Sequence, residues 1–514
     1  MSNAVWNHTI WLARVALLLI STCFSRMATG EPFHGGFLFD RFSLTLEAGR
    51  RTEAIGPLYY DDERESERTI AVPPLFSHWQ DDATDSEEFD MAYPLLTLDR
   101  FGCEYRWQIL QLLSFAGGRD QEDAAARRFT LFPFYFQQRS SDPAQNYTAL
   151  LPIYGHLKNR LFRSEIDFVL WPVYIKTVKR PTLKVPTDEP FLALAPAYLQ
   201  ARRGDVTTYN YIFPFFHRRY GEGLRGWQFW PLAGHEHKAV TTRTNDWGDA
   251  ETVPGHEKLF IMWPFFANQH RAIGTENPER QHFLLPFYNY LRSPKRDSTS
   301  YLWPVGVTIT DDRERGYHEV DATWPLVVFA HGEGKTTRRV WPLFSQASST
   351  NLQSNFYLWP LYKFNRIQSG ALDRDRTRIL FFLASDTNEK NTETGAAKRR
   401  TDFWPLFTWR RDFHGSTRLQ LFAPLEPVLP VSKSIERNYS PLWSVWRAEK
   451  NPGTGAASQS FLWNLYRRET TPESKKCSLL FGLFQYQSDS EARRLRLFFV
   501  PMGGKKSPPD DRTK

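Results

Sequence analysis

Short apolar segments recur along most of the chain, each bounded by polar or charged residues. Residues 355–364 are an example, Asn-Phe-Tyr-Leu-Trp-Pro-Leu-Tyr-Lys-Phe, in which aromatic and aliphatic side chains dominate. Apolar runs of this length between polar clusters are typical of β-strands. The segments return about every twenty residues, and we predict one strand for each of them.

A Trp-Pro-(Leu/Phe/Val)-(Phe/Tyr) motif lies at the centre of each segment. Weaker copies replace the tryptophan by Phe, Leu or Ala and bring the array to roughly 22 or 23 units. Insertions fall between units, the longest between Pro231 and Pro264. We assign a structural role to the tryptophan and proline of the five best copies, which are Trp171, Pro172, Trp263, Pro264, Trp341, Pro342, Trp359, Pro360, Trp404 and Pro405.

The proline predicts an irregularity in the middle of each strand, because proline has no N–H for a sheet hydrogen bond. Strict alternation would divide residues 355–364 into two faces. One face, wholly apolar, would carry Phe356, Leu358, Pro360, Tyr362 and Phe364. The other face, apolar only at its centre, would carry Asn355, Tyr357, Trp359, Leu361 and Lys363.

Connections between the segments are short and polar. Residues 408–418, for example, place Gly415 in a turn between two apolar segments, as in a β-hairpin. A βαβ crossover would need an amphipathic helix in each connection, for which there is no room. The predicted fold is therefore all-β, an antiparallel up-and-down meander of roughly twenty or more strands.

Two closures of this meander agree with the pattern. A large transmembrane β-barrel would explain the aromatic enrichment, the apolar face and strands of about ten residues. A propeller-like or other soluble β-repeat array would better explain why Trp359 and Leu361 occupy the second face. We favour the barrel and keep the soluble array as the alternative.

The first thirty residues predict a signal peptide. Arg14 precedes the apolar run Val15–Ile20, and a stretch ending Ala28-Thr29-Gly30 follows. A lipoprotein signal, with lipid attached to Cys23, is the competing interpretation. We divide the chain into a signal peptide (1–30), a β-strand repeat domain (31–503) and a polar C-terminal tail (504–514).

Composition adds two constraints. The aromatic share of 15% suits sheets and interfaces. The net charge of +8 favours anionic partners, but basic residues alternate with acidic ones in the connections, so solvated loops explain them. The expected partner is membrane lipid or an envelope glycolipid. Nucleic acid is not expected, and no protein partner is assigned.

No catalytic, cofactor or metal site is predicted. His235-Glu236-His237 has only two imidazoles, and we interpret it as a solvated hairpin end. Residues 332–337, Gly-Glu-Gly-Lys-Thr-Thr, lack the first glycine of a phosphate loop and suit a hairpin turn. The carboxylates Glu165 and Asp167 are interpreted as a strand entrance.

Export leaves Cys103 and Cys477 as the cysteines of the mature chain, either as one disulfide or as two free thiols. The Trp-Pro repeats over most of residues 55–503 resemble those of uncharacterised exported bacterial proteins. This resemblance implies a Gram-negative envelope location and brings no activity. The predicted function is that of a non-enzymatic cell-envelope protein, an outer-membrane barrel with a structural or transport-type role. The alternative is a soluble exported scaffold that binds a protein or glycan through its loops.

Overall fold

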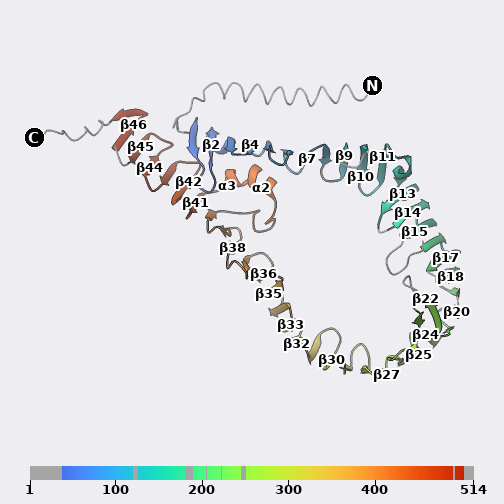
Figure 1. Cartoon of the computed structure of the whole chain (residues 1–514). Helices are drawn as coiled ribbons and strands as arrows, with labels where there is room; N and C mark the ends of the chain where they lie inside the picture. Colours follow the sequence, from blue (N-terminus) through green and yellow to red (C-terminus); the bar gives the residue numbers. More distant parts are fainter. Residues whose placement is uncertain are drawn as a thin grey trace, which may run out of the picture.

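A computed structural model describes residues 37–119, 125–161, 163–179, 189–203, 205–221, 223–244, 250–489 and 493–502. The predicted signal peptide, Cys23 and the tail 504–514 lie outside these residues. The described chain is almost entirely β-structure (Figure 1), which confirms the all-β prediction.

The strands of the first half are β1 (Asp40–Ser43), β2 (Gly49–Ala54), β3 (Tyr59–Arg64), β4 (Glu67–Val72), β5 (Phe76–Asp81), β6 (Ser86–Met91), β7 (Leu96–Phe101), β8 (Glu104–Ile109), β9 (Leu113–Arg119), β10 (Ala125–Leu131), β11 (Tyr135–Ser140), β12 (Tyr147–Leu150), β13 (Tyr154–Arg160), β14 (Arg163–Val169), β15 (Tyr174–Lys179), β16 (Glu189–Leu194), β17 (Tyr198–Arg203), β18 (Val206–Tyr211), β19 (Phe216–Gly221), β20 (Leu224–Phe229), β21 (Ala233–Lys238), β22 (Thr241–Thr244) and β23 (Ala250–Val253).

The strands of the second half are β24 (Gly255–Ile261), β25 (Phe266–Ile273), β26 (Glu279–Leu284), β27 (Tyr288–Arg292), β28 (Arg296–Tyr301), β29 (Val307–Asp312), β30 (Tyr317–Ala322), β31 (Val327–Gly332), β32 (Lys335–Val340), β33 (Phe344–Ser349), β34 (Leu352–Tyr357), β35 (Tyr362–Ser369), β36 (Leu372–Ile379), β37 (Ala384–Asn391), β38 (Ala397–Phe403), β39 (Phe407–Arg411), β40 (Thr417–Leu421), β41 (Trp446–Asn451), β42 (Ala456–Phe461), β43 (Tyr466–Thr470), β44 (Ser474–Leu479), β45 (Phe484–Asp489), β46 (Arg493–Leu497) and β47 (Val500–Met502). The helical elements are η1 (Gly56–Leu58), η2 (Pro143–Gln145), α2 (Lys433–Asn438) and α3 (Ser440–Trp443).

One continuous sheet contains 45 of these strands, each paired antiparallel with the next along the chain. The remaining two, β22 and β23, form a separate hairpin, which accounts for the long interval between Pro231 and Pro264. The up-and-down meander is thus confirmed. At about 4.8 Å per strand, the sheet is a ribbon about 200 Å long.

The predicted strand at residues 355–364 is wrong in one respect. β34 ends at Tyr357, the chain reverses over residues 358–361, and β35 begins at Tyr362. Phe356 pairs with Lys363 across this hairpin, so Phe356 and Tyr362 lie on opposite faces, not on one apolar face. The Trp-Pro motif is a turn, and each repeat of about twenty residues holds two short strands, most of them five to eight residues long.

Burial distinguishes the two faces of the ribbon. Cross-strand partners share a face, and by this criterion the buried strand residues between β4 and β42 lie on one face. They include Ala71, Asp90, Phe168, Glu236, Ala330, Thr337, Ser385, Asp402 and Ser458. The helix α2 also packs on this face, inside the curve that the ribbon follows in Figure 1. We call it the concave face and the opposite one the convex face.

A barrel closed by backbone pairing is not found in the described part of the chain, where β1 pairs only with β2 and β47 only with β46. The two ends of the ribbon meet through side chains instead. The blue and orange ends approach each other in Figure 1, with α2 and α3 between them. Phe37 packs edge-on against Phe481, and the amide of Asn464 donates to Glu53 over 2.6 Å.

Candidate functional site

The two edges of the ribbon have different chemistry because the two kinds of turn alternate along the chain. Turns that contain the Trp-Pro motif or its variants all lie on one edge, which we call the apolar edge. The turns between them, rich in Gly, Asp and Glu, form the polar edge. The peptide bond before proline is cis at fifteen apolar-edge turns, as in a type VI turn.

The structure brings all five predicted Trp-Pro pairs to the apolar edge. Their tryptophans remain between 36% and 52% exposed, and they are Trp171, Trp263, Trp341, Trp359 and Trp404. Rings of neighbouring turns contact each other, as where Trp341 lies 6.2 Å from Trp359, centroid to centroid. The edge is therefore a continuous apolar surface and not a set of isolated residues.

No charged residue occurs in the fifteen four-residue turns built on the cis prolines. The residue after proline is also large and exposed in most of them, as with Leu343, Leu361 and Leu406. A half-exposed aromatic or leucine side chain presents roughly 100 Å². Over some twenty turns the edge exposes on the order of 2,000 Å², well above the few hundred Å² that a single patch on a soluble monomer usually shows.

Aromatic side chains extend this surface onto the convex face, beside the apolar edge. Tyr198 and Tyr211 have ring centroids 5.6 Å apart, and Tyr211 lies 5.9 Å from Phe216. A similar ladder joins Tyr288 to Tyr301 at 5.5 Å. The hydrophobicity of each strand is thus graded along its length, from the aromatic end to the charged end.

The backbone of the apolar edge also favours a functional interpretation. Leu170, Met262 and Leu358 adopt φ values of +46°, +48° and +46°. This left-handed conformation costs a residue with a Cβ about 1–2 kcal/mol, and glycine would avoid that cost. The three side chains are 58%, 58% and 55% exposed, so packing within the chain does not offset the cost.

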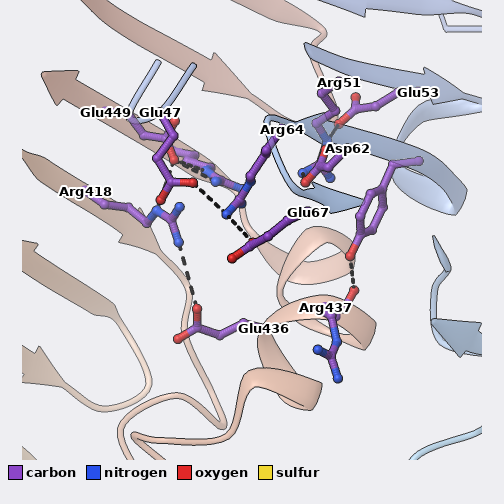
Figure 2. Close-up of polar contacts among 12 residues, drawn as sticks. Glu47, Arg51, Glu53, Asp62, Arg64, Glu67, Arg418, Glu436, Arg437 and Glu449 are labelled. Carbon is purple, nitrogen blue, oxygen red and sulfur yellow. Dashed lines mark hydrogen bonds and ion pairs between the residues drawn. The ribbon is translucent and has the colours of Figure 1, made fainter. Parts of the chain in front are cut away.

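Ion pairs hold the two ends of the ribbon together at the junction drawn in Figure 2. Arg437 of α2 lies 2.6 Å from Glu88 and 3.1 Å from Asp90, both on β6. The hydroxyl of Tyr60 donates to the Arg437 carbonyl over 2.8 Å, and Asn438 donates to Asp90 over 3.0 Å. Arg437, Asp90 and Asn438 are buried, so each of these polar groups depends on its partners.

The C-terminal side of the junction supplies a second set of charges. Glu449 on β41 lies 2.6 Å from Arg447 and 3.0 Å from Arg418. Burial alone would raise the pKa of Glu449, but these two guanidinium groups lower it to about 2. Arg418 also reaches Glu436 of α2 at 3.9 Å, which connects the strand to the helix (Figure 2).

The sequence candidate His235-Glu236-His237 lies within β21 and not at a hairpin end, which corrects that prediction. Glu236 faces the concave side, where it is 3% exposed and ion-paired with Arg219, His256 and Lys258. Its neighbours on both sides point to the convex face. In the part of the chain that the structure covers, no group of three or more His, Cys, Asp or Glu side chains is placed to hold a metal ion.

The remaining candidates from the sequence lie in strands and turns of the sheet. The predicted hairpin at 332–337 is confirmed between β31 and β32, with Gly334 at φ +72°. Glu165 and Asp167 lie inside β14, not at its entrance, and Asp167 contacts His156. Cys103 and Cys477 are both free thiols.

No helix within the described residues is long and apolar enough to cross a membrane. No protein-family model matches the chain, and no curated protein is detectably similar to it.

The sequence pattern predicted the tryptophans of the apolar edge as structural residues, but it predicted neither the turn geometry of that edge nor the junction. The repeat length could have revealed the turn geometry, since twenty residues are enough for two short strands and two turns. No sequence signal indicated the junction, because Asp90 and Arg437 are far apart in the sequence and lie in unrelated local patterns.

Proposed function

We propose that the chain is a non-enzymatic cell-envelope protein that lies on a membrane, with its apolar edge inserted into one leaflet and its polar edge in water. The observation that carries this proposal is the exposed apolar edge, whose fifteen cis-proline turns contain no charged residue. Trp and Tyr are enriched where membranes meet water, since their rings are apolar and carry a polar group. With the predicted signal peptide, the proposed location is the outer membrane of a Gram-negative bacterium.

Strand length favours insertion into one leaflet over a membrane-spanning barrel. Most strands have six residues, about 20 Å, whereas a spanning strand needs about nine to eleven. Their ends at the polar edge are charged as well. The apolar edge fits the boundary layer of a bilayer, where amphipathic surfaces insert about 5–10 Å.

A structural role follows from the shape of the ribbon. Because strands alternate in direction, every Trp-Pro turn lies on the same edge, and the curved ribbon presents them as one long arc (Figure 1). Such an arc can enclose or border a patch of membrane while its polar concave face stays in water. We infer a role in organising the envelope surface.

Flotation of the purified chain with phosphatidylcholine vesicles tests the proposal. The edge variant combines Leu343→Glu, Leu361→Glu and Leu406→Glu. Loss of three inserted leucines at about 2 kcal/mol each should lower membrane binding at least 100-fold. The matched control, Thr350→Glu with Ser369→Glu and Thr394→Glu, adds the same charge at exposed polar-edge positions of the same region and should float like the wild type.

Two results would contradict the proposal. One is a wild-type chain that stays at the bottom of the gradient as a monodisperse, detergent-free species. The other is a dimer in analytical ultracentrifugation that only the edge variant dissociates, without flotation, which would assign the apolar edge to contact between two copies.

A further inference from the structure

Three cations stand together on the concave face, one step inside the apolar edge. Lys363 follows the first residue of β35, and Arg378 precedes the last residue of β36. The two are direct cross-strand partners, and Arg376 lies two residues further along β36 on the same face. All three are partly exposed. We call Lys363, Arg376 and Arg378 the cationic cluster.

The cationic cluster differs from its surroundings in lacking anionic partners. Nearby Arg374 pairs with Glu389 at 3.3 Å, and Arg400 pairs with Asp402 at 2.8 Å. Among the described residues, no carboxylate lies within ion-pair distance of Lys363, Arg376 or Arg378. The Nε of Arg376 is buried and has no hydrogen-bond partner among them either. Burial and the neighbouring Arg378 and Arg374 lower the pKa of Arg376 by more than Asp402, beyond ion-pair distance, raises it.

The position of the cluster indicates its ligand. Ile379 and Tyr362, next to Arg378 and Lys363, adjoin the Trp359 turn of the apolar edge. If that edge lies among the lipid chains, the cluster lies at the depth of the phosphate groups. Guanidinium and ammonium groups are the side chains that bind phosphate best, since they combine charge with several donors.

We infer that the cationic cluster binds the phosphate of an anionic lipid headgroup on the concave side of the docked ribbon. This inference rests on the proposed membrane docking and extends it by naming a lipid class. Arg378 and Lys363 would contact the phosphate first, and Arg376 would bind it from the side away from the membrane. The unpaired cations would then gain the partner that the described chain does not provide.

The test compares flotation on neutral phosphatidylcholine vesicles with flotation on vesicles containing phosphatidylglycerol. The cluster variant is Lys363→Gln with Arg376→Gln and Arg378→Gln. Its matched control, Lys390→Gln with Lys398→Gln and Arg411→Gln, removes the same charge from the polar ends of β37, β38 and β39. A charge near an anionic surface changes binding about fivefold, and this attraction fades within about 8–10 Å in physiological salt.

We expect the wild type to prefer anionic vesicles, the cluster variant to lose most of this preference, and the control to keep it. Binding to neutral vesicles should be equal in all three. Equal losses in the cluster variant and the control would overturn the headgroup site while leaving membrane docking intact. Failure of the wild type to bind either vesicle would overturn the docking itself.

A third flotation experiment adds inorganic phosphate as a competitor. Added in place of chloride at constant ionic strength, it should leave vesicle binding unchanged, because a single dissolved ion lacks the support of the inserted edge. Displacement of the wild type from anionic vesicles by millimolar phosphate would assign the cluster to free phosphate and overturn the lipid assignment.

Discussion

The chain reverses direction at both edges of the ribbon, but different residues form the turns at each edge. Many polar-edge turns place glycine at their left-handed positions, as at Gly316, Gly334 and Gly370 with φ of +53°, +72° and +56°, although Asp85, Leu161 and Ala272 occupy the same region at other polar-edge turns. Apolar-edge turns place Leu170, Met262 or Leu358 in the same backbone region. The polar edge therefore more often has the residue that stability favours. The apolar edge keeps large side chains at a cost, which indicates selection for a contact outside the chain.

The junction is the third region in this comparison, because it holds the arc of both edges in place, with α2 and α3 in the connection between β40 and β41 on the apolar-edge side. Opening the junction should show whether membrane binding depends only on the apolar residues of the edge or also on their arrangement along one arc. If flotation needs only apolar turns, an open ribbon will bind as well as a closed one. If it needs the turns to lie along one arc, an open ribbon will bind more weakly.

The largest expected effect on stability is that of Arg437→Ala. The substitution leaves Asp90 buried without its cation, and breaking a buried pair in this way typically costs about 3–5 kcal/mol. We expect the ends of the ribbon to separate while the meander stays folded. Spin labels on β6 and β41 should report a longer and broader distance distribution by double electron–electron resonance.

Arg366→Ala is the control, because Arg366 forms a comparable pair with Asp373 at 2.6 Å on the exposed convex side. Exposed pairs contribute about 0–1 kcal/mol, so this variant should keep the wild-type distance. Equal broadening in both variants would contradict a specific role for the junction.

Acid should destabilise the C-terminal side of the junction, at β40 and β41, in a defined pH range. The pKa of Glu449 is about 2 in the folded chain, below the ordinary value of 4.5 for a glutamate, so the folded state binds fewer protons than the unfolded state between these values. The stabilisation is therefore complete above about pH 5 and is lost as the pH falls from about 4.5 towards 2. Denaturation at a series of pH values should show this slope.

Glu449→Gln isolates this contribution. The variant should be less stable than the wild type at pH 7 and should lose less stability on acidification. If both proteins lose stability in parallel below pH 4.5, other carboxylates control the acid transition and the role assigned to Glu449 is wrong.

Leu358→Gly makes an apolar-edge turn resemble a polar-edge turn. Relief of the left-handed leucine should raise the free energy of unfolding by about 1 kcal/mol. Loss of the inserted leucine side chain from the edge should weaken vesicle binding by about 2 kcal/mol, roughly thirtyfold. Chemical denaturation and flotation measure the two quantities on the same sample. A variant that is less stable, or that binds better, would contradict the assignment.

The sequence predicted the meander but not the division of each repeat. Apolar residues continue through the turn from Tyr357 to Tyr362, so hydrophobicity alone shows one strand where there are two. Pro360 was the available signal, because proline is rare inside paired strands. The hairpin around Gly415 was predicted correctly because its turn is polar and contains glycine, the usual composition of a β-hairpin turn.

The cationic cluster and the junction were beyond sequence reasoning for a different reason. Lys363 and Arg378 share a face only because the register of β35 against β36 makes them partners. Arg437 meets Asp90 because the whole ribbon curves back on itself. Neither relation leaves a periodic pattern in the sequence.

The most direct measurement of membrane docking uses both ends of one strand. Leu343 follows β32 on the apolar edge, and Glu333 precedes it on the polar edge. Each is replaced by cysteine, with the native cysteines changed to serine, and labelled with an environment-sensitive fluorophore. On vesicles carrying nitroxide-labelled lipid, the label at 343 should shift to the blue and be quenched, while the label at 333 should do neither. Equal responses at both positions, or a response only at 333, would contradict docking through the apolar edge.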